Sequence, residues 1–169
     1  METLEAIRTR RSIRKFEERI VPWQMEDQIL RAAMAAPSAG NQQSWEFVVV
    51  RDRKMLNAIP TVHPYAAMCP SAALVIVVCG VPVRERHRDF WVQDCSAAMQ
   101  NLLLAVHDLG LGAVWLGLYP RVDRVAGVRQ LLGIPDSIIP MCMAAIGHPA
   151  ETHPPQDRFD ATRVHLDRW

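Results

Sequence analysis

The sequence predicts an α+β fold, in which helices flank a central β-sheet. Apolar residues recur at helical spacing in several segments, and short runs rich in β-branched residues lie between these segments. The chain has 169 residues, half of them hydrophobic and 22% charged, which is typical of a globular domain with a substantial core. We therefore expect residues 1–169 to form a single domain.

The first half of the chain is predicted to contain two helices, a strand, a weaker helix and a second strand. These elements lie at 2–10, 24–35, 45–50, 52–58 and 73–81. Leu4 and Ile7 share one face of the first helix, and Pro37 and Gly40 stop the second. The second helix should turn four apolar side chains inward, those of Met25, Ile29, Ala32 and Ala33. The last strand is a continuous Val/Ile run, so we expect it to be buried on both faces.

The second half is predicted to contain a long helix, a strand, a helix and a final strand. These elements lie at 92–109, 113–117, 123–132 and 141–146. The long helix is apolar around most of its circumference, so it should be central, and a dimer would enclose it more easily than one chain. Gly110 and Gly133 follow the two helices as C-terminal caps. From Gly147 the chain becomes a polar tail with Phe159 and Trp169, which we expect to pack on something else, such as a second subunit.

Composition argues against several classes of protein. The formal net charge of +1 does not suit a protein that binds a nucleic-acid backbone, and the apolar run 72–79 is too short to span a bilayer. The N-terminus lacks the features of a secretory leader. The four cysteines include no Cys-x-x-Cys pair and read as buried free thiols, of which Cys79 and Cys142 lie in apolar runs. Free thiols indicate a reducing compartment, so we expect a cytoplasmic protein. The histidines show no paired ligand spacing, so we expect no metal.

A local cluster of cations follows the first helix. Residues 6–16 include Arg10, Arg11, Arg14 and two further cations but no acid. Guanidinium forks with the Ser12 hydroxyl between them suit a phosphate dianion. The alternative is a solvated basic end of a helix, which the helix dipole would favour.

Three more segments could contribute to a ligand site. Residues 37–45 offer small residues and then carboxamides, which match the edge of a heteroaromatic imide but also suit a polar turn. The run 110–117 leads from a helix into a strand, the reverse of a dinucleotide-binding loop, so we reject a Rossmann fold. Gly117 ends that strand and leaves backbone amides open to a ligand. Arg158 is either a second basic contact or a surface residue of the tail.

Taken in order, these segments resemble the FMN-dependent nitroreductase family over essentially the whole chain, in its short, single-domain form. Arg10, Arg11, Ser12 and Arg14 match the opening Arg-(Arg/His)-Ser-x-(Arg/Lys). The second motif, Pro-Ser-(Ala/Ser)-x-Asn-x-Gln-Pro-Trp, is matched by Pro37, Ser38, Ala39, Asn41, Gln43 and Trp45. A Gly-Leu-Gly-x-x-Trp-x-Gly run is matched from 110 to 117. The last motif, an Ile-Gly-x-Pro turn with a basic residue downstream, is matched by Ile146, Gly147, Pro149 and Arg158.

The resemblance implies a mostly antiparallel sheet in an intertwined homodimer, with FMN sites at the interface and a tail at about 148–169 packing on the partner. It implies that Arg10, Arg11 and Ser12 hold the FMN phosphate, that Arg158 closes over it, and that Arg14 lies by the pyrimidine end, where a cation favours the anionic reduced flavin. The remaining implied cofactor-binding residues are Pro37, Ser38, Ala39 and Asn41 from the other subunit, Gln43, and Leu116 and Gly117 near the hydride-accepting nitrogen.

The implied activity is that of an NAD(P)H oxidoreductase. NADH or NADPH would reduce FMN and leave, and a nitroaromatic, quinone or similar acceptor would then take the electrons in a ping-pong reaction. No side chain is expected to be catalytic, because the cofactor carries the chemistry. Two alternatives remain: another flavin-dependent outcome in the same fold, such as a dehalogenase-like or enone reductase activity, and a flavin-binding protein that does not turn over.

The chain departs from the family pattern in three places. Ser44 replaces the proline that usually precedes the tryptophan, and Gln156 stands where a second basic residue is common. Residues 55–70 are compact, whereas larger relatives have a helical excursion over the flavin. These departures leave the acceptor and the strength of phosphate binding open.

Overall fold

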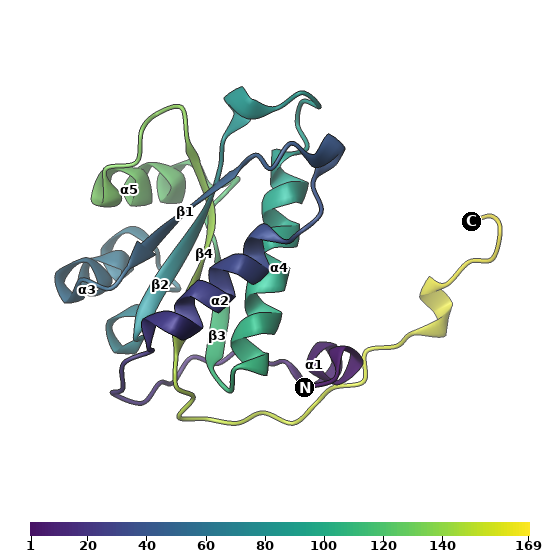
Figure 1. The fold of residues 1–169 in the computed structure, drawn as a ribbon, viewed down its shortest axis with the longest axis horizontal. Coiled ribbons are helices and arrows are strands. Elements are labelled where there is room, and N and C mark those ends of the chain that lie inside the picture. The colour runs from purple at the N-terminus through teal and green to yellow at the C-terminus, as the bar shows by residue number, and fades with distance from the viewer.

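The computed structural model describes all 169 residues and is built on a four-stranded sheet with the order β1-β2-β4-β3 (Figure 1). The strands are β1 (Trp45–Val50), β2 (Leu74–Gly80), β3 (Gly112–Gly117) and β4 (Ile139–Gly147). All three neighbouring pairs are antiparallel, and one parallel bridge joins Ser12 to Ala113 at the edge of β3. The predicted α+β fold with a mostly antiparallel sheet is therefore confirmed.

Helices cover both faces of this sheet. The structure has α1 (Thr3–Thr9), α2 (Trp23–Met34), α3 (Arg53–Val62), α4 (Trp91–Asp108) and α5 (Val122–Leu132). Figure 1 shows α2 and α4 on one side of the sheet and α3 and α5 on the other. None of these helices has the length and apolar character needed to cross a membrane.

Strand β2 separates two hydrophobic cores. Leu74, Ile76 and Val78 face the core formed with α2 and α4, whereas Val75 and Val77 face the core formed with α3 and α5. The alternation follows from the period of two residues in a strand. Every residue of β2 is buried, so the prediction of a strand covered on both faces is confirmed.

The long helix α4 is central, as predicted. It contacts α1, α2 and all four strands. It ends in a Schellman motif, in which Gly110 has φ +73° and donates to the His107 carbonyl while Leu111 donates to the Val106 carbonyl. Helix α5 likewise ends at a glycine in the left-handed conformation, Gly133, whose φ is +65°. Both predicted glycine caps are confirmed.

The prediction for α3 was too short, because the helix continues from 58 to Val62 and includes Pro60. Asp52 caps its N-terminus by accepting a hydrogen bond from the Met55 amide. Leu56 and Ile59 are almost completely buried in the core beneath it. Burial of this face stabilises the last turn even though proline cannot donate a backbone hydrogen bond there.

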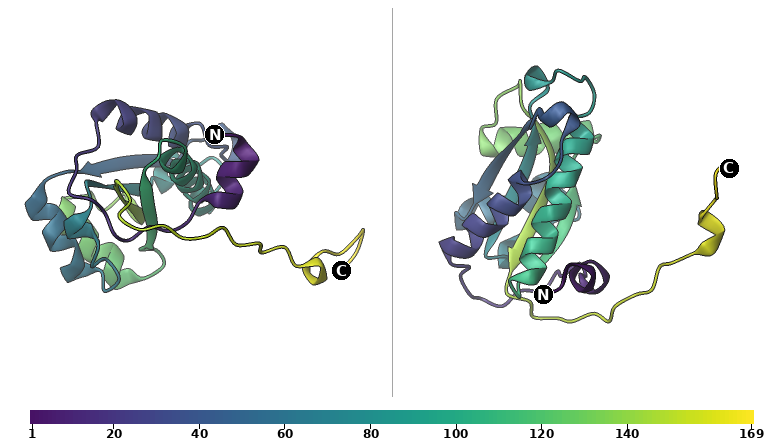
Figure 2. Two further views of the ribbon diagram at one scale, coloured as in Figure 1. Left: turned by 90° about the horizontal axis from the view of Figure 1, so that it is seen from below. Right: turned by 45° about the vertical axis from the view of Figure 1, so that its right-hand side comes forward.

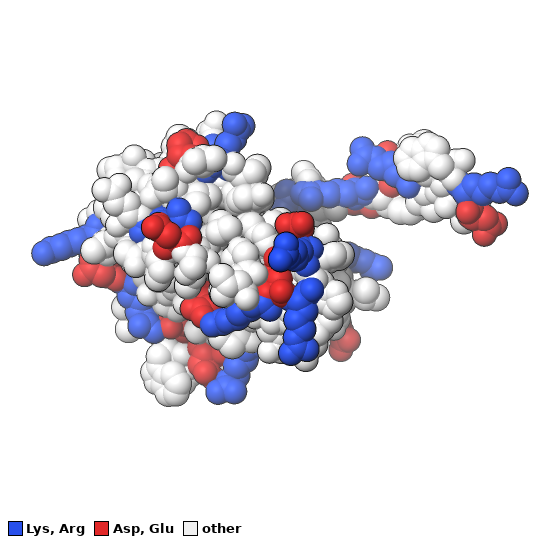
Figure 3. All heavy atoms as spheres, turned by 90° about the horizontal axis from the view of Figure 1, so that it is seen from above, with Lys and Arg blue, Asp and Glu red and all other residues white.

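The C-terminal tail leaves the body of the molecule (Figure 2). A bridge between Phe16 and Pro149 holds its beginning, and beyond Glu151 nearly every residue is exposed. Phe159, Leu166 and Trp169 have no apolar cover, and the tail carries charges of both signs (Figure 3). Its packing on a partner stays a prediction.

Candidate functional site

The predicted arginine cluster forms one wall of a polar pocket. Six residues line this pocket of about 250 Å³, none of them hydrophobic: Arg10, Arg11, Ser12, Arg14, His153 and Arg158. The segment after α1 is held against the sheet because the Ile13 amide donates to the Ala113 carbonyl at 2.9 Å. The tail brings Arg158 across from the other end of the chain. The structure thus gathers the four residues predicted to bind the phosphate together with Arg14, which was predicted at the pyrimidine end, and adds His153, which sequence reasoning missed.

This pocket is strongly electropositive. None of its four arginines takes part in an ion pair. Burial, together with the neighbouring guanidinium groups of Arg158 and Arg11, lowers the pKa of Arg10. Like charges held together without a carboxylate repel one another, and a bound anion would relieve that repulsion. The arrangement therefore fits a phosphate dianion.

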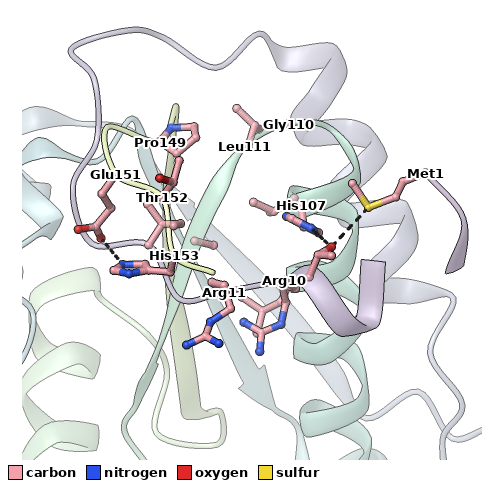
Figure 4. A pocket seen from close by; sticks show the side chains of 15 residues that line it. Met1, Arg10, Arg11, His107, Gly110, Leu111, Pro149, Glu151, Thr152 and His153 are labelled. Carbon is pink, nitrogen blue, oxygen red and sulfur yellow. Dashed lines mark hydrogen bonds and ion pairs between the residues drawn. The ribbon is translucent and has the colours of Figure 1, made fainter. Parts of the chain in front are cut away.

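A second pocket, of about 290 Å³, adjoins the first (Figure 4). Glu151 and His153 lie on one side of it and His107 on the other, with Arg10 and Arg11 between them. The His107 Nε2 atom is 2.8 Å from Thr9 Oγ1, which ties the end of α1 to the end of α4. Burial and the charge of Arg10 lower the pKa of His107, so its imidazole is neutral at physiological pH.

Further along β3, the outer edge of the strand is open. Leu118 donates to Met141 on β4, so the alternation of an antiparallel ladder turns the amide of Leu116 toward β4 and that of Gly117 away from it. A Cβ atom added to Gly117 would meet no atom within 4 Å. Gly117 is four residues after Ala113, which is about 13 Å along a strand. A cationic pocket and a free backbone amide thus lie along one edge, at a separation that a ribityl phosphate and the adjoining ring can span.

Two side chains contact the carbonyl of Gly117. Its carbonyl is 3.0 Å from His63 Nε2 and accepts a hydrogen bond from Arg124 at 3.1 Å. The Tyr65 amide donates to the other ring nitrogen of His63, so Nε2 carries the proton and donates to Gly117. Because His63 is buried, this pair of donors fixes the orientation of the peptide group that follows Gly117.

The loop 37–45 is organised by a buried carboxylate that sequence reasoning missed. Asp94, in the first turn of α4, accepts hydrogen bonds from the Ala39 amide at 2.9 Å, Gln42 Nε2 at 2.8 Å and Ser44 Oγ at 2.9 Å. The available signal was an acid in the first turn of a helix that is largely apolar. The contact also explains the departure at Ser44, since proline has no donor for Asp94.

The same loop carries backbone strain at two predicted site residues. Asn41 and Gln43 have φ values of 54° and 48°, in the left-handed region, and the neighbouring Gly40 has a φ of 53°. Such conformations cost about 1–3 kcal/mol each for residues other than glycine and cluster at functional sites. The Ser38 hydroxyl accepts from the Gln43 amide at 3.0 Å, and the exposed Asn41 and Gln43 side chains contact each other. Pro37 is exposed at the start of the loop.

The structure does not bring the loop and the arginine cluster together within one chain. Asp94 anchors the loop near the start of α4, and His107 anchors Thr9 near its end. His107 is thirteen residues after Asp94, which is about 20 Å along a helix. Figure 1 shows the two segments at opposite ends of α4.

The comparisons with known proteins agree with this architecture. The Nitroreductase family model matches residues 7–68 and 61–148. A protein of Methanothermobacter thermautotrophicus, provisionally named an NADH dehydrogenase/NAD(P)H nitroreductase, is 53% identical over 169 residues, covering 100% of this chain and 88% of the relative. A crystal structure of a protein with the same provisional name from Parabacteroides distasonis has a TM-score of 0.95 at 41% identity and covers 99% of this chain and 98% of its own.

A third comparison includes a cofactor. The structure of a provisionally assigned nitroreductase from Desulfovibrio desulfuricans in complex with FMN has a TM-score of 0.85 at 30% identity, covering 98% of this chain and 96% of its own. The family match extends over most of the chain, and the relatives match it nearly end to end. The chain belongs to the nitroreductase family.

Proposed function

We propose that this protein is an FMN-dependent NAD(P)H oxidoreductase that reduces nitroaromatic, quinone or similar acceptors. The observation that carries the proposal is the unpaired arginine cluster on the same strand edge as the open amide of Gly117. Family relatives named NAD(P)H nitroreductase and FMN reductase, and one solved with FMN, support it.

The residues present fit FMN. Arg10, Arg11, Ser12 and Arg158 would hold the phosphate, because the pocket supplies only polar and cationic groups with no competing carboxylate on its wall. Arg14, exposed beside them, would face the pyrimidine end of the ring. When bound, FMN supplies the redox chemistry, taking a hydride from NADH or NADPH and passing electrons to the acceptor.

The chain's own contribution is then binding and positioning. The Gly117 amide points away from β4 and can donate a hydrogen bond. Because glycine has no side chain, a planar ring can approach the strand edge at this residue. His63 and Arg124 hold this end of β3 in place. Holding two reacting rings in contact makes the transfer effectively unimolecular, which is where an enzyme of this kind gains its rate.

The site is proposed to be shared by two chains of a homodimer. Pro37, Ser38, Ala39, Asn41 and Gln43 would come from the partner, which the separation of about 20 Å along α4 supports. The exposed apolar residues of α1 and of the tail supply surface for such an interface, with residues 1–169 as one domain and about 148–169 packing on the partner. Four buried free thiols suit a reducing compartment such as the cytoplasm.

The test is anaerobic reduction of the FMN-loaded protein with NADH and with NADPH. Loss of the flavin absorbance, followed by its return when a nitroaromatic or quinone is added, is the expected result. Bound flavin that neither nucleotide bleaches would replace the proposal with a non-catalytic flavin-binding protein. Bleached flavin that only halogenated aromatics or enones reoxidise would indicate a dehalogenase-like or enone reductase activity. Protein that cannot be loaded with FMN would end every flavin-based proposal.

A further inference from the structure

His153 is the one residue of the cationic pocket that is not explained by the family motifs. It lies in the tail, five residues before Arg158, and lines both the pocket of the arginines and the adjoining one. Figure 4 shows its ring beside Glu151, with Arg11 and Arg10 below. Its side chain is 41% exposed, so an incoming anion can reach it.

Hydrogen bonds between the tail and the arginine segment fix the position of His153. The Ala150 amide donates to the Lys15 carbonyl at 2.9 Å, which fastens the tail to the segment after the arginines. Glu151 accepts hydrogen bonds from the backbone amides of Arg14 at 2.6 Å and Lys15 at 3.2 Å. The same carboxylate lies 3.5 Å from His153 Nε2. Glu151 therefore binds the tail to the arginine segment and orients the imidazole of His153 at the pocket.

Glu151 brings a carboxylate next to the imidazole of His153. The Arg14 amide, and after it the contact with His153, lower the pKa of Glu151, so this carboxylate is ionised at neutral pH. With Nε2 turned toward Glu151, the Nδ1 atom has no partner within the chain and is available to the pocket. A protonated imidazole would also shield a bound anion from the carboxylate.

We propose that His153 is a ligand of the cofactor phosphate and supplies this site with a proton-dependent positive charge. The inference rests on the proposed function, because the phosphate is that of FMN. The chain has Gln156 where a second basic residue is common in the family, and Gln156 instead accepts a weak hydrogen bond from Arg158 at 3.3 Å. His153 takes the place of that missing cation.

The charged groups around His153 differ in their side-chain chemistry. Charged and titratable groups face it from the N-terminal segment, the tail and the end of α4: Arg10, Arg11, Arg14, Arg158, Glu151, His107 and the amino group of Met1. Arginine stays protonated, whereas histidine changes charge between about pH 5 and 8. His107 is kept neutral by burial and Arg10, and the Met1 amino group is paired with Asp108 at 2.8 Å. FMN affinity should therefore fall as the pH rises past neutrality.

The experiment measures the dissociation constants of FMN and of riboflavin, which lacks the phosphate, with the full-length protein freed of flavin. At about pH 6.5, His153→Gln should weaken FMN binding by about tenfold, the effect of one charge-assisted contact that is partly screened by solvent, and leave riboflavin unchanged. At about pH 8.5 the same variant should match the parent protein. His153→Arg should bind FMN tightly at both pH values. His165→Gln is the matched control, since that histidine stacks on Trp169 in the distal tail.

The comparison with His153→Gln also separates the proton of the imidazole from that of the phosphate, which itself titrates near pH 6. Unchanged FMN affinity in His153→Gln at both pH values would overturn the inference while leaving the proposed function intact. An equal loss for FMN and riboflavin would assign His153 a structural role and also overturn it. A parent protein that binds neither flavin would overturn both the inference and the proposed function.

Discussion

A mixed dimer can show whether two chains share each flavin site. One chain would carry Arg10→Ala with Arg158→Ala, which removes two phosphate contacts. The other would carry Asn41→Gly, which removes the carboxamide of the loop. Glycine is the better replacement because Asn41 has φ +54°, a conformation that penalises alanine. Asn41 is exposed, so little stability is lost with its side chain.

The expected stoichiometry follows from the distance between the two segments. Their anchors on α4 are about 20 Å apart, so a shared site takes its arginines from one chain and its loop from the other. The heterodimer then contains one intact site and one site with both defects, and it should retain about half the FMN of the parent dimer. Each homodimer of a variant has two damaged sites, and loss of one charge-assisted contact weakens binding by roughly 10- to 100-fold.

The assay uses two affinity tags, so that only dimers containing both chains are purified, followed by dialysis and measurement of flavin per protein. Parent chains carrying the two tags serve as the control. A heterodimer that forms but retains no more FMN than the variant homodimers, while the control retains its flavin, would refute the division of the site between chains.

Three further outcomes follow from individual residues. Asp94→Ala leaves three hydrogen-bond donors without their acceptor, so it should lower the unfolding free energy by about 3 kcal/mol and Tm by roughly 10 °C. A change in Tm below about 2 °C would contradict this. Gly117→Ala should leave Tm within about 2 °C, because the added Cβ meets open space, yet weaken FMN binding at least about tenfold in a fluorescence titration; unaltered binding would count against the Gly117 contact. Burial raises the pKa of the Cys69, Cys79 and Cys95 thiols from 9.0 to about 12, so only the unfolded chain ionises at these thiols as the pH rises above 9. The unfolding free energy from urea titrations should therefore fall by about 3 kcal/mol between about pH 9 and 10, and a flat profile would argue against the burial of these thiols.

Local patterns in the sequence were sufficient to predict the order and type of the elements. Helix and strand periodicity depend on neighbours within one or two turns, and caps such as Gly110 and Gly133 depend on the conformation of one residue. The same local character explains the error at Pro60, where burial of Ile59 against distant parts of the chain stabilises a turn that local rules would end.

The fold class and the chemistry of the arginine cluster follow from the sequence alone, because periodicity, glycine caps and side-chain charge are properties of short segments. Which segments meet depends on the folded chain as a whole. It joined Arg158 and His153 to Arg10 across most of the chain, paired Asp94 with a loop some fifty residues earlier, and separated that loop from the arginines along α4. Such contacts form when the whole core packs, so they cannot be predicted from the spacing of residues within a motif.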